Sequence, residues 1–345
     1  MSDSPFDIPK IKRDPVGCQP NESTAPRAKP DYSAAILSSP VLSELDAPKR
    51  TPLLGCWMKE ADLGFIFAAR GVGKTWMTML IGNALVNAVS LGEWQAGVSQ
   101  RRVLYVDGEM ALADSRERTR TIGITSPNFQ WLHHEWLFEK TEQILNIANS
   151  DCREAVSELL RDGDVLILDN LSALCRGVAE NDNDSWEILL PWLLSFRRRK
   201  VTVIIVHHAG RNGEMRGASR REDAANWILR LQDDTQGDDE CQKAIISSFP
   251  KARGCRPQEA APMRWVIKTE GGSLAITCKP HTGPDALCVH ILEGVESATE
   301  CADLLGVGKG TVSKWAKRLA GAGRIRIESG KYLPPNSGTD RSSRK

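Results

Sequence analysis

The chain has 345 residues, of which 41% are hydrophobic and 26% are charged. This composition is usual for a soluble globular protein that buries a sizeable core, and it excludes a globally disordered chain. Lys and Arg number 45 against 44 Asp and Glu, so the formal net charge is +1. Such a balance neither requires nor excludes a polyanionic partner, and any nucleic-acid site must therefore be local. The length predicts about two structural units.

Cysteine spacing and apolar runs indicate the cellular compartment. The cysteines are scattered and include no C-x-x-C pair, so the sequence predicts neither a zinc site nor a disulfide scaffold. We expect reduced thiols in a cytoplasmic protein. The chain begins without the apolar region of a signal peptide and has no run of about 18 apolar residues, so we expect no membrane partner. The nine cysteines are Cys18, Cys56, Cys152, Cys175, Cys241, Cys255, Cys278, Cys288 and Cys301.

Prolines dominate the first segment, residues 1–48. Eight of them, among many Ser, Asp and Lys residues, prevent regular structure from running far. The composition predicts a flexible N-terminal segment. Alternatively, the segment could be an arm that docks on a neighbouring subunit, with residues 34–37 (Ala-Ala-Ile-Leu) as a short anchor.

Residues 49–282 alternate short apolar runs with helical patterns. Uninterrupted apolar runs at 165–168 and 201–206 suit strands buried on both faces, and strands separated by helices suit a parallel sheet. The pattern predicts a doubly wound α/β domain. Its end, at 263–268 and 273–277, predicts a β-hairpin that turns at Gly271 and Gly272.

Residues 283–333 follow a different, mainly helical pattern. The stretches 298–305 and 309–319, joined by a tight turn at Gly306 and Val307, predict a helix-turn-helix. Apolar residues on either side of Gly330 could form a two-stranded wing, which suggests a winged-helix unit. The tail at 334–345 is rich in Pro, Ser and Arg, and we expect it to be disordered. Inward-facing positions are predicted at Ala302, Leu305, Val307, Val312 and Leu319.

The strongest motif is A-A-R-G-V-G-K-T at residues 68–75, between a predicted strand and a predicted helix. In this setting, glycines let backbone amides surround a phosphate at the helix N-terminus, Lys74 reaches the β- and γ-phosphates, and Thr75 binds Mg²⁺. Ala68 replaces the first glycine of the motif, which requires its φ to stay negative. We therefore predict bound ATP and Mg²⁺. The predicted nucleotide-binding residues are Ala69, Arg70, Gly71, Val72, Gly73, Lys74, Thr75 and Trp76.

Two acidic residues follow predicted strands. Asp169 ends the strand at 165–168 and is placed to bind Mg²⁺ beside the phosphate loop, although it could simply form a turn. Glu109, in the Asp-Gly-Glu sequence after the strand at 103–106, is the candidate general base that activates water. The alternative for Glu109 is a solvated side chain in a turn, because the sequence cannot place its strand beside the phosphate loop.

A further strand ends at His207 and His208 and precedes an arginine-rich loop. One of the two histidines could hydrogen-bond the γ-phosphate, so both are candidate catalytic residues, although a structural role is an equal alternative. Arginines among Gly and Ser beside a phosphate site suit contacts with a single-stranded DNA backbone, or else a solvated surface. The candidate DNA-binding residues of this loop are Arg211, Arg216, Arg220 and Arg221.

These motifs, in this order over about residues 50–280, resemble the RecA-like hexameric helicases of plasmids and mobile elements, the RepA type. The resemblance implies a RecA-like P-loop NTPase core and a homo-oligomeric, hexameric ring, with ATP between neighbours and single-stranded DNA in a central pore. It gives Lys74 and Thr75 to phosphate and magnesium, Glu109 to water, and Asp169 to the metal. It also implies that Arg253, supported by Lys251, enters the active site of the neighbouring subunit.

The C-terminal helix-turn-helix is an addition to the pattern of this family. Its second helix carries Lys309 and Lys314, which are candidate contacts to duplex DNA, although such a unit can instead mediate protein contacts. The leading hypothesis is an ATP-driven helicase or translocase of plasmid or mobile-element replication. The alternative is a RecA-like DNA-binding ATPase switch, acting in regulation, recombination or partition without unwinding DNA.

Overall fold

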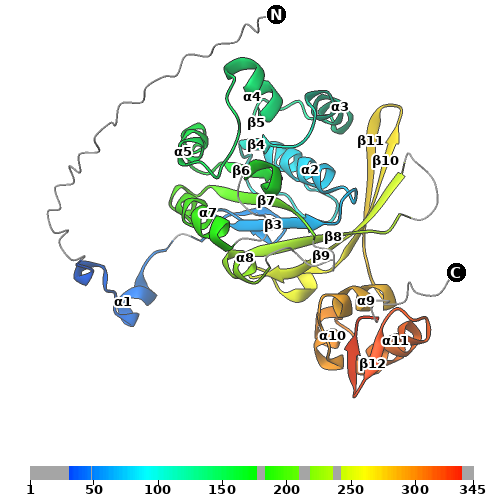
Figure 1. The fold of residues 1–345 in the computed structure, drawn as a ribbon. Coiled ribbons are helices and arrows are strands. Elements are labelled where there is room, and N and C mark those ends of the chain that lie inside the picture. The colour runs from blue at the N-terminus through cyan, green and yellow to red at the C-terminus, as the bar shows by residue number, and fades with distance from the viewer. Residues whose placement is uncertain (1–30, 48, 177–182, 210–217, 236–241, 336–345) are drawn as a thin grey trace, which may run out of the picture. The chain divides into compact units, whose positions relative to one another are not determined.

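The computed structural model describes residues 31–47, 49–176, 183–209, 218–235 and 242–335 (Figure 1). The chain divides into two units, Met1–Lys49 and Arg50–Lys345. In the described part of the first unit, the short helices η1 (Ser33–Ala35) and α1 (Ser39–Glu44) have no buried residue. Ile36, in the predicted anchor, is 78% exposed. The docking role of this segment stays a prediction.

The second unit is built on a large mixed sheet. Within the described residues, nine strands pair in the order β11-β10-β9-β8-β3-β7-β6-β4-β5. Strands from β8 to β5 in this order pair in parallel, and β8 to β11 pair antiparallel. The predicted mostly parallel α/β fold is therefore confirmed. The strands are β3 (Leu63–Ala68), β4 (Val103–Asp107), β5 (Phe129–His133), β6 (Val165–Asp169), β7 (Thr202–His208), β8 (Trp227–Asp233), β9 (Gln242–Ala252), β10 (Met263–Glu270) and β11 (Ser273–Pro280).

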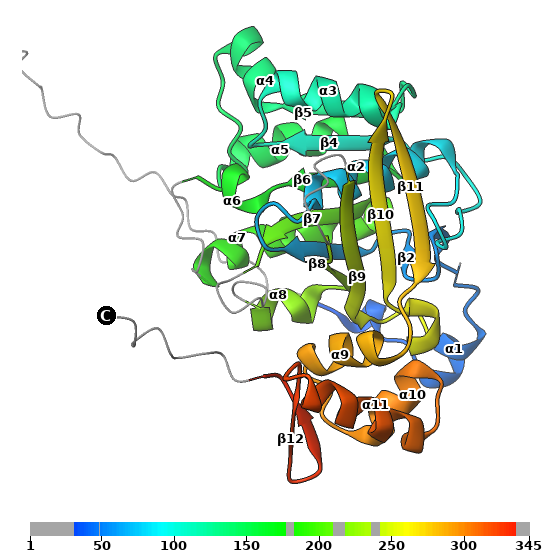
Figure 2. The same ribbon diagram turned by 90° about the vertical axis from the view of Figure 1, so that its right-hand side faces the viewer.

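Helices cover both faces of this sheet, as Figures 1 and 2 show from two directions. Alternate residues of β3 face opposite sides: Ile66 packs in the core that contains α2, and Phe65 packs in the core that contains α5 and α7. The helices are α2 (Lys74–Asn87), α3 (Leu112–Ile122), α4 (His134–Thr141), α5 (Ser150–Leu159), α6 (Leu171–Leu174), α7 (Asn183–Ser195), η2 (Phe196–Arg199), α8 (Ala218–Ala224) and η3 (Pro257–Ala260), with a small sheet of β1 (Pro52–Leu54) and β2 (Met58–Lys59).

The predicted hairpin at the end of the sheet is confirmed. β10 and β11 pair antiparallel, and their last partners are Glu270 and Ser273. Gly271 and Gly272 have φ of +57° and +80°, so both central residues of the two-residue turn occupy the left-handed region that glycine tolerates best. β5 and β8 were not recognised from the sequence, because these short runs mix apolar residues with polar ones.

The C-terminal elements are α9 (Pro284–Leu292), α10 (Ala298–Leu305), α11 (Lys309–Gly321), β12 (Arg326–Glu328) and β13 (Lys331–Leu333). They enclose a hydrophobic core of their own, to which Val312 and Leu319 contribute buried side chains. Gly306 joins α10 to α11 at φ +64°. The helices and the two strands therefore occur where the sequence predicts them, while a winged-helix function stays a prediction. In the described residues, no helix is both long and apolar enough to span a membrane.

The expectation that the cysteines are reduced thiols is wrong for one pair. Cys56 and Cys255 form a disulfide, with their Cα atoms 5.5 Å apart and a sequence separation of 199. Folding brings the turn between β1 and β2 next to the segment after β9, where Lys59 also donates a hydrogen bond to the carbonyl of Gly254 (3.1 Å). The sequence contains no local C-x-x-C signal for such a long-range pair.

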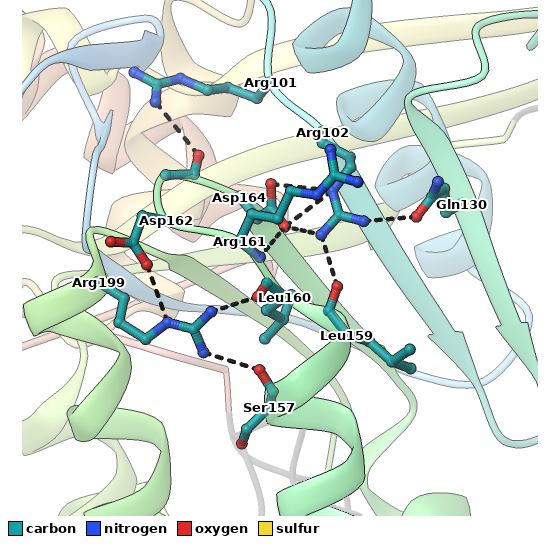
Figure 3. A network of polar contacts seen from close by, with 11 residues as sticks. Arg101, Arg102, Gln130, Ser157, Leu159, Leu160, Arg161, Asp162, Asp164 and Arg199 are labelled. Carbon is teal, nitrogen blue, oxygen red and sulfur yellow. Dashed lines mark hydrogen bonds and ion pairs between the residues drawn. The ribbon is translucent and has the colours of Figure 1, made fainter.

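A polar network links β4, β5 and β6 at their N-terminal ends (Figure 3). Arg102, just before β4, donates from Nε to both carboxylate oxygens of Asp164 (3.2 and 3.0 Å), just before β6. It also donates to the side chain of Gln130 in β5 (2.8 Å) and to the carbonyl of Leu159 in α5 (2.7 Å). The Arg102 and Asp164 side chains are only 13% and 6% exposed. Each therefore depends on the other for neutralisation.

We expect Arg102→Ala to lower the free energy of unfolding by about 3 kcal/mol, because it leaves the buried Asp164 carboxylate without its partner. The exposed Arg198 provides a matched control. Arg198→Ala should change stability by less than about 0.5 kcal/mol. Denaturant titration of both variants makes the comparison, and equal stabilities would contradict a structural role for the Arg102 network.

Candidate active site

The loop between β3 and α2 has the conformation that phosphate binding requires. Gly71 and Gly73 have φ of +77° and +110°, values that other residues rarely adopt. A Cβ atom on Gly73 would also lie 2.9 Å from Cδ1 of Ile245 in β9. Ala68 belongs to β3 and does not have a positive φ, so it fits in place of the usual glycine. The backbone amides of the loop can therefore surround an anion at the N-terminus of α2.

Lys74, the first residue of α2, is almost buried at 7% exposure. Its Nζ donates to the carbonyl oxygens of Ala68 (3.1 Å) and Ala69 (3.0 Å). Burial lowers the pKa of the Lys74 ammonium, while the charges of Asp169 and Glu109 act to raise it. The ammonium thus lies desolvated beside two carboxylates, where the negative oxygens of a polyphosphate would be strong partners.

Strand order brings the acidic residues to the phosphate loop. β3, β7, β6 and β4 are consecutive neighbours, and the register aligns Ala68 with His208 and Asp107 with Asp169. The C-terminal ends of these parallel strands therefore share one edge of the sheet. A cavity of about 440 Å³ opens there. Among the described residues it is lined by Arg70, Gly71, Gly73, Lys74, Thr75, Trp76, Glu109, Met110, Arg118, Asp169, Asn170 and His208.

Asp169 provides a buried carboxylate at the floor of this cavity, with 5% of its surface exposed. Burial raises the pKa of Asp169 to about 6, the charges of Asp107 and Glu109 add to this rise, and hydrogen bonds from Tyr105 and Thr75 oppose it. The Tyr105 hydroxyl donates to Oδ2 at 2.6 Å. The Thr75 hydroxyl and the Asp169 carboxylate are adjacent hard oxygen donors, the kind that Mg²⁺ prefers. These two residues therefore fit a magnesium ion.

Glu109 reaches the same cavity from the turn after β4. Its side chain is 60% exposed, so water can approach the carboxylate. The side-chain amide of Asn170 donates to Oε2 of Glu109, and this amide nitrogen also lies 3.1 Å from Nε2 of His208. His208 Nε2 is 3.8 Å from the same carboxylate oxygen. The structure thus brings Glu109 and His208 together beside Lys74, as an active site requires, while their catalytic roles stay predictions.

The side chains of His207 and His208 lie on opposite faces of the sheet. The expectation that His207 is a catalytic residue beside the γ-phosphate therefore needs correction. Consecutive strand residues point to opposite faces, so His208 faces the cavity while His207 faces the other core. There Nε2 of His207 lies 2.7 Å from the guanidinium of Arg221. Arg221 is only 5% exposed, which is inconsistent with its predicted contact to DNA. Arg220 belongs to α8, and Arg211 and Arg216 lie outside the described residues.

Lys251 and Arg253 lie far from the cavity of their own chain. The register pairs Ala252 with Trp227 in β8, and Trp227 with Gly64 near the start of β3, whereas the phosphate loop follows the end of β3. Lys251 donates to the carbonyl of Glu222, and Arg253 donates to the carbonyl of Asp223 at 3.1 Å. Neither is among the described residues that line the cavity. If these cations act on a nucleotide, it must be one held by another subunit.

Three residues that line the cavity were missed by sequence reasoning: Met110, Arg118 and Asn170. Asn170 directly follows Asp169, and its position at the end of β6 was an available signal. Arg118 comes from α3, and its guanidinium carbon lies 5.5 Å from the ring centroid of Trp76. No pattern in the sequence places Arg118 of α3 beside Trp76, because that contact depends on where β4, the strand before α3, lies in the sheet. Arg118 adds a positive charge where a polyphosphate would lie.

Lys309 and Lys314 lie on α11, away from this cavity. Both side chains are exposed, as are those of Lys317 and Arg318 on the same helix. The helix begins at Lys309, so its N-terminus combines the orphan amides of a helix start with basic side chains. This surface suits an anionic partner, and contact with DNA stays a prediction.

Comparison with known proteins assigns the family. A family model described as an AAA domain matches residues 39–214, which is just over half of the chain. The chain belongs to the AAA domain family. Membership agrees with the geometry of the site and supports a RecA-like P-loop ATPase that uses a nucleoside triphosphate. The match includes the phosphate loop, Glu109, Asp169 and His208, and it ends before β8.

Among solved structures, the chain is similar to the flagellar accessory protein FlaH from Methanocaldococcus jannaschii, with a TM-score of 0.43 and 14% identity over 63% of this chain and 89% of that one. It is also similar to a KaiC-like protein from Pyrococcus horikoshii OT3, with a TM-score of 0.44 and 14% identity over 65% and 91% of the two chains. No curated protein matches the sequence.

We expect Asp169→Asn to stabilise the nucleotide-free protein. The folded-state pKa of Asp169, about 6, lies above its ordinary value of 3.8, so ionisation of this buried carboxyl opposes folding at neutral pH. The cost is complete above the folded pKa and disappears as the pH falls below the ordinary value. An amide avoids it and can still accept the hydrogen bond from Tyr105. The expected gain is about 2 kcal/mol at about pH 7.5 and smaller at about pH 5.

Thermal unfolding at the two pH values measures this gain. Asp162→Asn is the matched control, because the Asp162 side chain is 78% exposed and its neutralisation should add no stability. A gain in stability of Asp169→Asn that does not depend on pH, or a loss of stability, would contradict a destabilising charged carboxylate at this position.

Proposed function

We propose that this AAA-family ATPase is a DNA helicase or translocase that works as a homo-oligomeric, hexameric ring in the replication of plasmid or mobile-element DNA. The observation that carries the proposal is the convergence of Lys74, Thr75, Glu109 and Asp169 on one cavity. These are the cation, the two magnesium-binding oxygens and the base that the hydrolysis of ATP needs. The order of the sequence motifs supplies the link to helicases.

The chemistry of hydrolysis follows from this arrangement. The amides around Gly71 and Gly73 would bind the polyphosphate, and Lys74 would exchange the carbonyl oxygens of Ala68 and Ala69 for phosphate oxygens. Thr75 and Asp169 would hold magnesium, which when bound would neutralise negative charge on the polyphosphate.

Glu109 is the general base of the proposed reaction. Its carboxylate would accept a proton from a water molecule as the water oxygen bonds to the γ-phosphorus. The bond from this phosphorus to the β–γ bridging oxygen breaks, and ADP and inorganic phosphate are released. Asn170 donates to Glu109 and would hold the carboxylate toward the water, and His208 lies where it could bond a γ-phosphate oxygen.

A ring would bring Lys251 and Arg253 of one subunit to the nucleotide of another. Lys251 and Arg253 lie at the end of the sheet opposite the phosphate loop, so one chain cannot bring them to its own nucleotide without refolding β9. In a head-to-tail ring, each subunit presents one surface to the opposite surface of its neighbour. Arg253, with Lys251, would then neutralise charge on the phosphoryl group held by the next subunit.

A second candidate is an ATPase switch that binds duplex DNA without unwinding it. The specific observation in its favour is the exposed basic surface of α11, which carries Lys309 and Lys314 on a unit with its own hydrophobic core. A helix with basic residues at its N-terminus suits insertion into a major groove. In this reading, nucleotide controls oligomeric state, and DNA does not accelerate hydrolysis.

The first experiment measures ATP turnover of the full chain with and without single-stranded DNA, together with its mass by light scattering. We expect about tenfold or greater stimulation in a ring-sized oligomer, since binding of DNA completes the interfaces between subunits, followed by ATP-dependent strand displacement. Glu109→Gln is the control, which should bind nucleotide and lose turnover. Turnover that ignores single-stranded DNA, with binding to duplex DNA and no unwinding, would favour the switch.

Mixed oligomers test whether Arg253 acts in trans. Arg253→Ala and Lys74→Ala proteins should each lose most turnover, the first with nucleotide binding intact. When they are mixed, a site with the phosphate loop of the Arg253→Ala subunit and the arginine of the Lys74→Ala subunit is complete. A random equimolar mixture contains about a quarter of such interfaces, so about that share of wild-type turnover should return.

Arg256→Ala is the matched control for this exchange, because Arg256 is exposed three residues further along the chain. It should retain wild-type turnover alone. If the mixture of Arg253→Ala and Lys74→Ala stays inactive although a tag on one variant co-purifies the other, Arg253 does not act across an interface.

A further inference from the structure

The turn that carries Glu109 is held by its backbone. The amide of Gly108 donates to the carbonyl of Asp169 (2.9 Å), which joins the turn to β6. The amides of Glu109 and Met110 both donate to Oδ1 of Asp107, at 2.9 and 3.0 Å. Asp107 is 1% exposed, so this carboxylate is available only to the interior. Its role is to shape the turn, and Glu109 is left free to reach the cavity.

The end of β5 supports the outer side of the same turn. The parallel register places His133 beside Asp107, so the residues that follow β5 lie next to the residues that follow β4. Nε2 of His134 lies 3.0 Å from the carbonyl oxygen of Met110. A carbonyl can only accept, so the His134 ring donates this hydrogen bond. Oε2 of Glu135 accepts from the amide of Leu112 at 2.7 Å.

A buried chain of hydrogen bonds joins these two supports. His133 Nδ1 accepts from the amide of Glu135 (3.3 Å), so its ring proton lies on Nε2, which is 3.2 Å from the hydroxyl of Ser115. That hydroxyl in turn donates to Oδ2 of Asp107 at 3.2 Å. His133 and Ser115 are each 3% exposed. Burial lowers the pKa of His133, which favours the neutral ring that this chain of donors requires.

These contacts constrain Glu109 without entering the cavity. His133, His134 and Glu135 are absent from the described residues that line it. The Glu109 side chain is 60% exposed, so few packing contacts limit its movement, and its position depends on the hydrogen bond from Asn170 and on the backbone of the turn. A displacement of about 1 Å in a catalytic group can cost about 100-fold in rate. A rigid support at this turn therefore has a direct effect on the reaction.

We propose that the corner between β5 and α4, formed by His133, His134 and Glu135, is a positioning element that fixes the turn carrying Glu109 for hydrolysis. The inference rests on the proposed function, in which Glu109 is the base. These residues act through the turn and touch neither the nucleotide nor the attacking water. The set of strands that serve the site thus includes β5, although β4 is the last strand in the sheet whose following residues line the cavity.

The test compares Glu135→Ala with Glu135→Gln in the full chain. The alanine variant removes the acceptor for the Leu112 amide, whereas glutamine keeps a side-chain oxygen in its place. We expect kcat of Glu135→Ala to fall about tenfold, with KM for ATP and the Kd for a non-hydrolysable ATP analogue within about twofold of wild type. Glu135→Gln should restore most of kcat.

Glu139→Ala is the matched control, because Glu139 lies on the same helix with its side chain 58% exposed. It should leave kcat unchanged. A wild-type kcat in Glu135→Ala would overturn the inference, and so would a loss of kcat accompanied by equal losses of analogue binding or thermal stability. Full turnover in Glu109→Gln would instead refute the base itself, so failure of the inference and failure of the proposed function give different results.

Discussion

The alignment of parallel strands is the constraint on which the site depends. β3, β7, β6 and β4 lie side by side with the same direction, so residues that end these strands must meet at one edge of the sheet. That edge receives the phosphate loop from β3, His208 from β7, Asp169 from β6 and Glu109 from the turn after β4. The buried apolar faces of the sheet stabilise this arrangement, and the polar residues at the edge depend on it for their positions.

Two charged residues at this edge of the sheet, Asp169 and Lys74, destabilise the folded chain locally, and both belong to the candidate active site. Asp169 keeps a carboxylate in a buried position where its ionisation is costly, and Lys74 keeps an ammonium largely away from water. A magnesium polyphosphate could replace the internal partners of both groups, because the hydrogen bonds that Lys74 makes within the described residues go to backbone carbonyls of the loop. The network around Arg102 and Asp164 at the other end of the strands is a contrast, because there the charges neutralise each other.

Two other parts of the molecule bear on how hydrolysis would be used. Lys251 and Arg253 lie near the start of β3, whereas the phosphate loop follows its end, a placement that suits action between subunits. α11 presents its basic residues on a unit with a separate core. The β5–α4 corner is a third such part, because β5 is the edge strand next to β4 and the turn after β4 carries Glu109.

The sequence by itself determined the α/β class, the phosphate loop, the hairpin at Gly271 and the order of the C-terminal elements. These features are local: they follow from apolar periodicity, glycine conformation and turn chemistry within a few residues of one another. Only the tertiary structure decided which histidine faces the cavity, that Arg118 and Asn170 line it, and that Cys56 pairs with Cys255. Each of these depends on strand order or on the face to which a side chain points, and pairing between distant segments leaves no signal in a single stretch of sequence.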